Sequence, residues 1–290
     1  MEKLRLKRHG SFYVREGWME KAINIIADNK ESGSIFRKEV GVANLGIGAM
    51  MVPSLKYWMV ASNIIDERTS CFTSFGELLL KYDRYLEYDF SWWMIHQHLV
   101  CNFKDSPVFN ITFNYFRKGN FTKDDLVDFL AQFMKEHDYE CGNEKYISDD
   151  ASILINSYLK GKIENPEDNK ISPFAKLELL KRTSDDKYEF SMPRRDKLSY
   201  LAVYACLIKA MEEGKESINI DDLSEVENNP MKVFNLDKNS FYLYLNDMKE
   251  AGLITINKTA GLNMIYINDK YSADDVDEFV FEQYFEKGGK

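Results

Sequence analysis

The spacing of apolar residues along the chain predicts a mainly α-helical protein. In the segment 17–30, Trp18, Ala22 and Ile26 recur at helical spacing and mark one face of a helix. The same criterion predicts further helices at 50–62, 75–85, 90–101, 107–116, 148–160, 198–211 and 237–251.

Local signals set several of the predicted boundaries. Thr122 and Asp125 have the spacing of a capping box, with Asp in place of the usual Glu, and start a helix that ends near His137. The segment 46–48, Gly-Ile-Gly, predicts a tight turn, and Asn63 can take the left-handed conformation that ends a helix.

The clearest pattern lies near the C-terminus. After the helix 237–251, Gly252 predicts a helix stop, 253–256 a strand, 258–261 a turn and 262–267 a returning strand. A helix followed by a hairpin, with the helix 198–211 packed behind it, is typical of a winged helix-turn-helix, although other small α+β domains share this order. The segment 50–65 follows a similar plan of helix, turn and extended piece.

These patterns together predict a helical protein with winged-helix-like modules. The polar stretch 162–170, which contains Asn165-Pro166, is the best candidate linker. We therefore expect three domains: an N-terminal winged-helix-like module at 1–72, a helical domain at 73–164, and a C-terminal winged helix with a small hairpin and a terminal helix at 171–290.

The amino-acid composition limits the classes of partner that the protein can bind. The 290 residues include 38 Lys and Arg against 47 Asp and Glu, a net charge of −9, which argues against indiscriminate polyanion binding but permits a local basic face. The first ten residues are basic and the last seventeen are mainly acidic. No signal-peptide core and no apolar run long enough for a membrane span occur in the sequence, so a cytoplasmic protein without membrane contact is expected.

Recognisable catalytic and metal-binding motifs are absent from the sequence. The 4 cysteines form no CxxC pair, and His96 and His98, two positions apart on a predicted helix, point to different faces. The segment 46–48 lacks the GK[ST] of a phosphate loop, and no GxSxG elbow occurs. We expect no metal and no cofactor; an enzyme whose site converges from distant residues stays open as an alternative.

Candidate binding residues fall into two groups. Cations in or before the helix 50–62 favour nucleic-acid binding, and the candidates are Arg15, Arg37, Lys38, Ser54, Lys56 and, in the hairpin, Lys258. The helix 237–251 is nearly charge-neutral and carries Tyr242 and Tyr244, which fits a protein contact better than a phosphate backbone.

Several short segments resemble a bacterial family, domain-of-unknown-function family 4007. The resemblance rests on residues 15–22 (REGWMEKA), 45–48 (LGIG), 51–52, 55–58 (LKYW), 75–79, 83–87, 92–96 (WWMIH), 172–175, 233–237 and 259–262. In that family Lys and Asn usually follow the second glycine of LGIG, whereas this chain has Ala49 and Met50 and cannot make any phosphate or base contact that depends on that pair. The resemblance implies an association with DNA-modification or phage-defence genes, including sulfur-modification systems, and little chemistry.

Two hypotheses of function follow. The first is a non-enzymatic winged-helix protein that contacts DNA within a bacterial DNA-modification or defence system. The second is an adaptor that binds a protein of such a system without touching DNA. The sequence does not give the oligomeric state.

Overall fold

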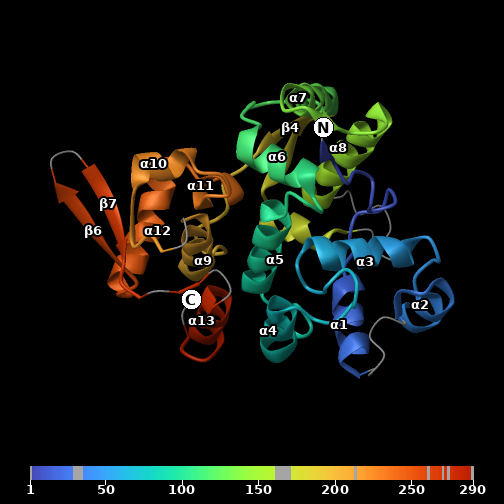
Figure 1. Ribbon diagram of the computed structural model, residues 1–290, viewed down its shortest axis with the longest axis horizontal. Coiled ribbons are helices and arrows are strands. Elements are labelled where there is room, and N and C mark those ends of the chain that lie inside the picture. The colour runs from blue at the N-terminus through green and yellow to red at the C-terminus, as the bar shows by residue number, and fades with distance from the viewer. Residues whose placement is uncertain are drawn as a thin grey trace. The chain divides into compact units, whose positions relative to one another are not determined.

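The computed structural model divides the chain into two compact units, Met1–Ser191 and Met192–Lys290, which are described separately. It describes residues 2–28, 35–160, 171–211, 214–259, 262–269, 271–272 and 275–288. Both units are mainly helical (Figure 1), as the apolar spacing predicts. No helix in these ranges combines the length and the apolar character needed to cross a bilayer.

Unit 1 is built from helices joined by short strands. Its elements are β1 (Glu2–Lys3), α1 (Trp18–Asp28), α2 (Lys38–Leu45), α3 (Met51–Ala61), α4 (Ser74–Asp83), α5 (Asp89–Cys101), α6 (Pro107–Tyr115), α7 (Lys123–Glu136), β2 (Tyr139–Glu140), α8 (Glu144–Tyr158), the 3-10 helix η3 (Pro173–Leu177), β3 (Leu180–Ser184) and β4 (Lys187–Phe190). β1 pairs parallel with β2, and β3 pairs antiparallel with β4.

The core of unit 1 is organised around α5. Residues 90–97 of this helix are all buried, so no side of it faces water over two turns. Aromatic rings from other elements close around it: the Phe174 ring of η3 lies 5.7 Å from the Trp92 ring and 6.2 Å from the Trp58 ring, centroid to centroid. A helix that is buried on every side must be enclosed by other elements, and here residues far apart in the sequence enclose it.

Two buried polar groups of this core have clear partners, whereas the buried side-chain amide of Gln97 on α5 makes no hydrogen bond to a described residue. His96, fully buried, has its Nδ1 2.6 Å from the Tyr158 hydroxyl, and the indole of Trp58 donates to the Phe12 carbonyl at 2.9 Å. The sequence predicts that His96 either packs in the interior or lies on the surface, and in the structure it lies in the core. His98 takes a different direction and packs on Phe75, with ring centroids 4.0 Å apart.

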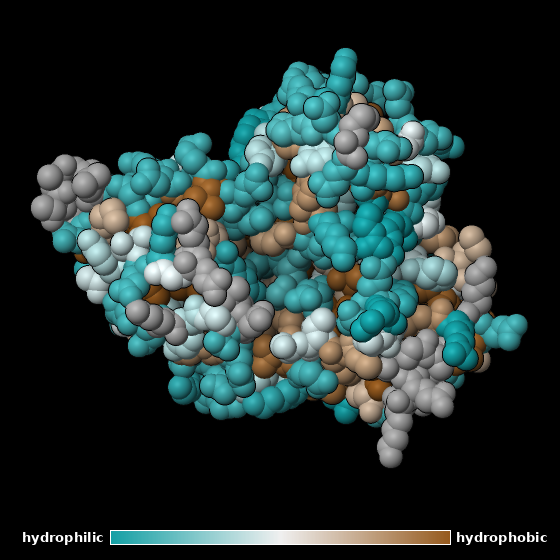
Figure 2. Space-filling view, viewed as in Figure 1, coloured by the Kyte–Doolittle hydropathy of each residue, from teal (hydrophilic) through white to brown (hydrophobic). Residues whose placement is uncertain are grey.

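α7 shows how local sequence fixes an element. Thr122 Oγ1 accepts from the Asp125 amide at 3.1 Å, and Asp125 Oδ2 accepts from the Thr122 amide at 2.8 Å, which is the predicted capping box with Asp in the acidic position. Only Leu126, Leu130 and Met134 of the helix are buried, and the part of the surface that carries α7 is hydrophilic (Figure 2).

Unit 2 combines helices with one small sheet. Its elements are α9 (Tyr200–Ala210), β5 (Ser217–Asn219), α10 (Ile220–Glu225), α11 (Pro230–Val233), α12 (Lys238–Glu250), β6 (Ile254–Thr259), β7 (Leu262–Ile267) and α13 (Asp275–Phe285). The sheet has the order β5-β7-β6, and both pairings are antiparallel. α11, α12 and α13 all pack on the apolar α9.

The domain division differs from the one expected from the sequence. Segments 1–72 and 73–164 lie in a single unit, because α5 needs both of them around it. Unit 2 begins at Met192 and not at residue 171, because η3 packs on α5 and α8, and Tyr188 of β4 bridges to Phe121. The predicted linker 162–170 lies outside the described residues.

The segment 62–73 follows the predicted plan of helix, turn and extended piece only in part. Asn63 has the left-handed φ of 56° that ends α3, as predicted. The extended piece after it, however, makes one isolated bridge from Ile65 to Phe72 and no strand pair.

Gly76 gives a test of this packing. A Cβ at this position would lie 2.0 Å from the Ile64 carbonyl oxygen, so Gly76→Ala must displace backbone, although Ala is intrinsically better than Gly in a helix by about 1 kcal/mol. We expect Gly76→Ala to lower the free energy of unfolding by about 2 kcal/mol or more in urea titrations followed by circular dichroism. Gly119→Ala, where a Cβ meets nothing within 4 Å, is the matched control and should change little; equal stability of the two variants would contradict the packing described.

Candidate functional site

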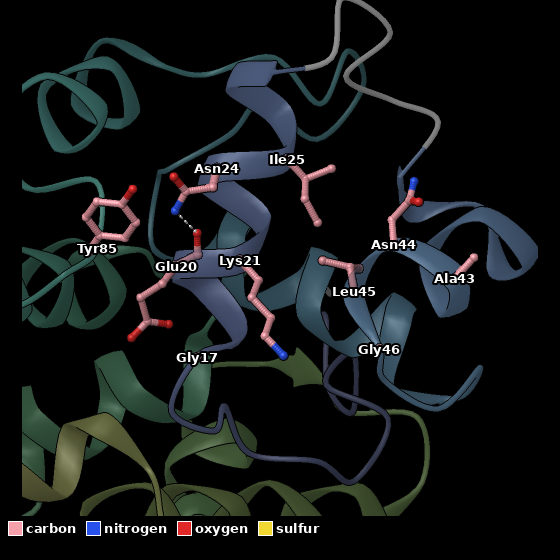
Figure 3. Close-up of a pocket in the computed structure, with 10 residues that line it drawn as sticks. All are labelled: Gly17, Glu20, Lys21, Asn24, Ile25, Ala43, Asn44, Leu45, Gly46 and Tyr85. Atoms are coloured by element: carbon pink, nitrogen blue, oxygen red, sulfur yellow. Dashed lines mark hydrogen bonds between the residues drawn. The ribbon is translucent and has the colours of Figure 1, made fainter.

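The first candidate site is a groove on α1. Its floor is the helix face of Gly17, Glu20, Lys21, Asn24 and Ile25, and its volume is about 520 Å³. The C-terminal end of α2 and the turn after it form one wall, and Tyr85 lies on the opposite side of α1 (Figure 3). We call this the α1 groove, and its lining is completed by Ala43, Asn44, Leu45 and Gly46.

Two segments singled out in the sequence meet in this groove. Residues 15–22 supply the start of α1, and residues 45–48 supply the end of α2. Gly46 has φ 65° and its amide donates to the Val42 carbonyl at 3.1 Å, so the predicted tight turn ends α2 at the wall of the groove. These segments are 23 or more positions apart in the sequence, and folding makes them neighbours.

The walls are held by specific contacts. The Asn24 side-chain amide donates to the Glu20 carbonyl at 2.7 Å, the dashed line of Figure 3, and Asn24 Oδ1 accepts from Arg84 Nε at 2.6 Å. The Arg84 guanidinium lies 5.4 Å from the centroid of the Tyr85 ring. Asn24 therefore ties α1 to the segment that carries Tyr85, and this ring is 59% exposed.

Glu20 is the unusual group of the groove. Its Oε2 is buried and makes no hydrogen bond to any described residue. Burial raises the pKa of the Glu20 carboxyl from 4.5 to about 7, and the backbone amide of Glu20 and the Lys176 ammonium offset only part of that increase. Lys176 is itself paired with Glu16 at 2.5 Å, so Glu20 has no dedicated cation.

A second cavity of about 530 Å³ lies beside the N-terminal segment, and Lys3, Arg5 and Arg8 are among the residues that line it. The two arginines are already paired with carboxylates. Arg5 and Arg8 both bind Glu67 and Asp105, with Arg8 at 2.6 Å and 3.0 Å from them. The Arg5 guanidinium, with help from Arg8, lowers the pKa of Glu67 to about 2.

The next residues of this segment are bound to α8. Lys7 Nζ lies 2.5 Å from Asp149, and the Lys7 amide donates to Asp150 at 3.0 Å. The Ser11 amide donates to His9 Nδ1, so His9 Nε2 carries the proton and donates to Asp150 Oδ1 at 2.7 Å, with both side chains buried. Arg5, Lys7 and Arg8 of the basic N-terminus are thus paired with carboxylates of described residues.

The residues predicted to contact nucleic acid differ in their exposure and in their partners. Arg37 is exposed and no ion pair joins it to a described residue, and Lys56 lies with Nζ 5.8 Å from the Phe36 ring, next to Arg37 in the chain. Arg15 stacks its guanidinium 5.5 Å from the Trp18 ring and is half-buried. The side chains of Lys38 and Lys258 lie outside the described part of the structure.

Ser54 and Tyr244 do not have the exposure that a contact residue needs. Ser54 is 1% exposed and donates to the Phe12 carbonyl at 3.2 Å, because α3 turns this side toward the N-terminal segment. Tyr244 is 1% exposed on the face of α12 that packs on α9, while Tyr242 is half-buried. On α12 the exposed apolar residue is Leu243, at 52%, which the sequence reasoning did not select.

Cations near α12 are neutralised by neighbours. Lys238 pairs with Asp221, and Arg195 pairs with Asp247 while its guanidinium lies 4.2 Å from the Tyr244 ring. Arg194 pairs with Asp196 at 2.7 Å. Lys238, Arg194 and Arg195 are therefore matched by carboxylates, whereas Lys249 in the last turn of α12 is exposed and forms no ion pair with a described residue.

Comparison with known proteins gives the family. The model of the family described as "Protein of unknown function (DUF4007)" matches residues 6–284, so the chain belongs to this family. Two solved structures, described as "SspB crystal structure" and "Magnesium ion-bound SspB crystal structure", have the same fold: each gives a TM-score of 0.82 over 98% of this chain and 89% of its own, at 20% and 19% identity. No curated protein sequence matches the chain. Within the described ranges, no group of three or more His, Cys, Asp or Glu side chains is arranged to hold a metal ion.

The environment of Glu20 gives a pH-dependent stability. The folded-state pKa of about 7 exceeds the unfolded value of 4.5, so the folded protein holds this proton more tightly. Stability attributable to Glu20 therefore falls as the pH rises from about 4.5 to 7 and is level above that range. We expect Glu20→Gln to raise the free energy of unfolding at pH 8, because it removes a buried charge. The increase should be on the order of 1–2 kcal/mol, less than the pKa shift alone implies, because solvent screens part of the Glu20 carboxyl. At pH 4, where the carboxyl is mostly protonated in both states, the substitution should have no such effect. Glu77→Gln, an exposed site on α4, is the control for urea titrations at both pH values. A Glu20→Gln effect that is the same at pH 4 and pH 8 would argue against a desolvated carboxyl.

Asp149 and Asp150 provide a second, matched pair. Asp150→Ala leaves the His9 Nε2 proton and the Lys7 amide without an acceptor in a buried place, and should lower the free energy of unfolding by about 2–3 kcal/mol. Asp149→Ala removes only a partly exposed ion pair and should change it by less than about 1 kcal/mol. Chemical denaturation at pH 7.5 measures both, and equal losses would show that the buried hydrogen bonds contribute no more than the exposed pair.

Proposed function

We propose that unit 2 is a winged helix and that the protein is a non-enzymatic, DNA-associated component of a bacterial DNA-modification or phage-defence system. The observation that carries the proposal is the order of elements in unit 2: α9, β5, α10 with α11, α12, then the β6–β7 hairpin, in a sheet of order β5-β7-β6. A helix, a strand, two helices and a hairpin whose second strand returns beside the first strand form a winged helix, with α12 in the position of the recognition helix. The genomic setting comes from the family resemblance alone.

Electrostatics favour unit 1 for the DNA contact. Phosphate binding needs cations whose charge is not already matched, because affinity comes largely from counterion release. No carboxylate of a described residue pairs with Arg37 or Lys56, and Lys56 Nζ lies 5.8 Å from the ring of Phe36, the residue before Arg37. Lys38 follows Arg37 directly in the sequence and is a further candidate cation.

The DNA contact is tested by mobility shifts across a salt series. Arg37→Ala with Lys56→Ala should weaken binding of a plain duplex and reduce the slope of log K against log salt by about 2, because each of the two cations would neutralise one phosphate. Lys135→Ala with Lys145→Ala removes the same charge from exposed sites of α7 and α8 and is the control. Wild-type affinity and slope in the first variant would exclude this site, and the absence of any shift with plain or modified duplexes would exclude the DNA-binding role.

A second candidate function is an adaptor that binds a protein partner through α12. Leu243 is 52% and Met192 50% exposed, and Met192 lies beside α12, where its sulfur accepts from the Ser240 hydroxyl at 3.6 Å. Leu243 and Met192 are exposed apolar residues, and several nearby cations are already paired with carboxylates. Such a surface fits a protein partner better than a phosphate backbone.

The adaptor function is tested by co-purification of the full-length chain with the proteins encoded beside it. Leu243→Asp should abolish a stable complex and leave duplex binding unchanged, while Lys249→Ala, an exposed change on the same helix, should leave the complex intact. Loss of duplex binding in Leu243→Asp would instead place α12 on DNA.

A further inference from the structure

The α1 groove carries two side chains of opposite charge, Glu20 and Lys21, and neither forms an ion pair with a described residue. Glu20 Oε2 is buried and has no hydrogen-bond partner among the described residues. Lys21 is exposed, and its ammonium reaches back toward the Gly17 end of α1, on the other side of the helix from the Glu20 carboxyl (Figure 3). A ligand that satisfies both groups must offer a hydrogen-bond donor at one end and a negative charge at the other.

The space between these groups is suited to a flat, partly apolar body. Tyr85 presents an aromatic ring that is 59% exposed on the Glu20 side, and Ile25 and Leu45 line the other part of the groove. Gly17 has no side chain and nothing within 4 Å of an added Cβ, so the end of the groove near the Lys21 ammonium is open. The volume of about 520 Å³ exceeds that of a single aromatic ring and admits a ring with an attached sugar.

The Glu20 and Lys21 side chains point in different directions. Their divergence excludes small ligands whose hydrogen-bond donor and negative charge lie close together. Neighbouring helix positions diverge by about 100°, so Glu20 and Lys21 do not face one point in space. The ammonium and carboxylate of a free amino acid are separated by one carbon and cannot meet both. A lysine or arginine side chain of a partner protein would use Glu20 and be repelled by Lys21.

We infer that the α1 groove binds a nucleotide whose base carries an exocyclic amino group: Tyr85 stacks on the base, the Glu20 carboxylate accepts from the amino group, and Lys21 with the N-terminal end of α1 binds the phosphate. Aromatic stacking with a carboxylate on a base edge is a known way to hold an unpaired base, and a helix N-terminus next to an ammonium favours phosphate. The inference deepens the proposed function, because an extruded base of DNA and a free nucleotide share this chemistry.

Ionisation of Glu20 should make the affinity for the nucleotide depend on pH. The carboxylate is the stronger acceptor, and with a pKa of about 7 the ionised fraction rises from about one-tenth at pH 6 to about nine-tenths at pH 8. Nucleotide affinity should therefore rise up to about tenfold over this range in the wild type and stay nearly level in Glu20→Gln, which controls for ionisation of the phosphate.

The experiment is isothermal titration calorimetry of the full-length protein with deoxynucleoside monophosphates. We expect dAMP and dCMP to bind, and dTMP, which has no exocyclic amino group, to bind at least about tenfold more weakly. Tyr85→Ala should weaken dAMP binding roughly five- to hundredfold, and Glu20→Ala, which has no side-chain acceptor, should remove the preference over dTMP. Tyr88→Ala and Glu77→Gln change exposed residues outside the groove and should match the wild type, and thermal melting checks that each variant folds.

A competition arm separates the two sources of the base. Displacement of dAMP by a duplex with one adenine opposite an abasic site, and not by the fully paired duplex, identifies an extruded base; displacement by neither identifies a free nucleotide. Equal binding of dAMP and dTMP, no binding of either at millimolar concentration, or wild-type affinity in folded Tyr85→Ala overturns the inference. Nucleotide binding without any duplex binding would support the groove and reject the DNA-associated function, and duplex binding that is insensitive to Tyr85 and Glu20 would do the reverse.

Discussion

The constraint on which unit 1 depends is the enclosure of α5. Ten of its 13 residues are buried, including a pair of adjacent tryptophans, so water can reach neither side of the helix. Trp58 from α3, Tyr158 from α8 and Phe174 from η3 surround it, and the residues between α8 and unit 2 must turn back to complete this shell. Because the shell draws on residues from position 58 to position 174, no shorter part of unit 1 has a closed core of its own. The α1 groove lies on the outer side of this shell, where α1 and α2 cover α3.

The elements that the sequence predicts well are those whose signal is local. The capping box at Thr122, the left-handed Asn63 and the stop at Gly252 depend on neighbours within a few residues, and the structure has each of them. α2 was not predicted, because its apolar residues form no stripe and Gly41 interrupts it; the glycine is there because a Cβ would lie 2.6 Å from the Ile35 carbonyl oxygen. β3 and β4 were also missed, since most of their side chains are exposed or half-exposed and their place depends on a bridge to Phe121.

Only part of the candidate site could be predicted from the sequence. The segments 15–22 and 45–48 were singled out by resemblance, but nothing in their spacing indicates that they line one groove with Tyr85. Glu20 was not selected, because a glutamate in the first turn of a helix is ordinary until its burial is known. Ser54 was selected from its position on a cation-bearing helix, and it lies on the buried side of that helix. Charge counting likewise identified the basic N-terminus but not the carboxylates of Glu67, Asp105 and Asp149 that match it.

The ties of the N-terminal segment have a consequence for biosynthesis. β1 pairs with a strand at Tyr139, and His9 and Lys7 bind the acidic pair at 149–150. On the ribosome, the first ten residues leave the exit tunnel long before their partners have been translated, at about 5–20 residues per second. Arg5 and Arg8 can pair once Glu67 and Asp105 have been made, whereas Lys7 and His9 stay without their partners until α8 has been made. Closure of the N-terminal segment is therefore a late event of synthesis, and such long-range contacts slow the folding of unit 1 as a whole.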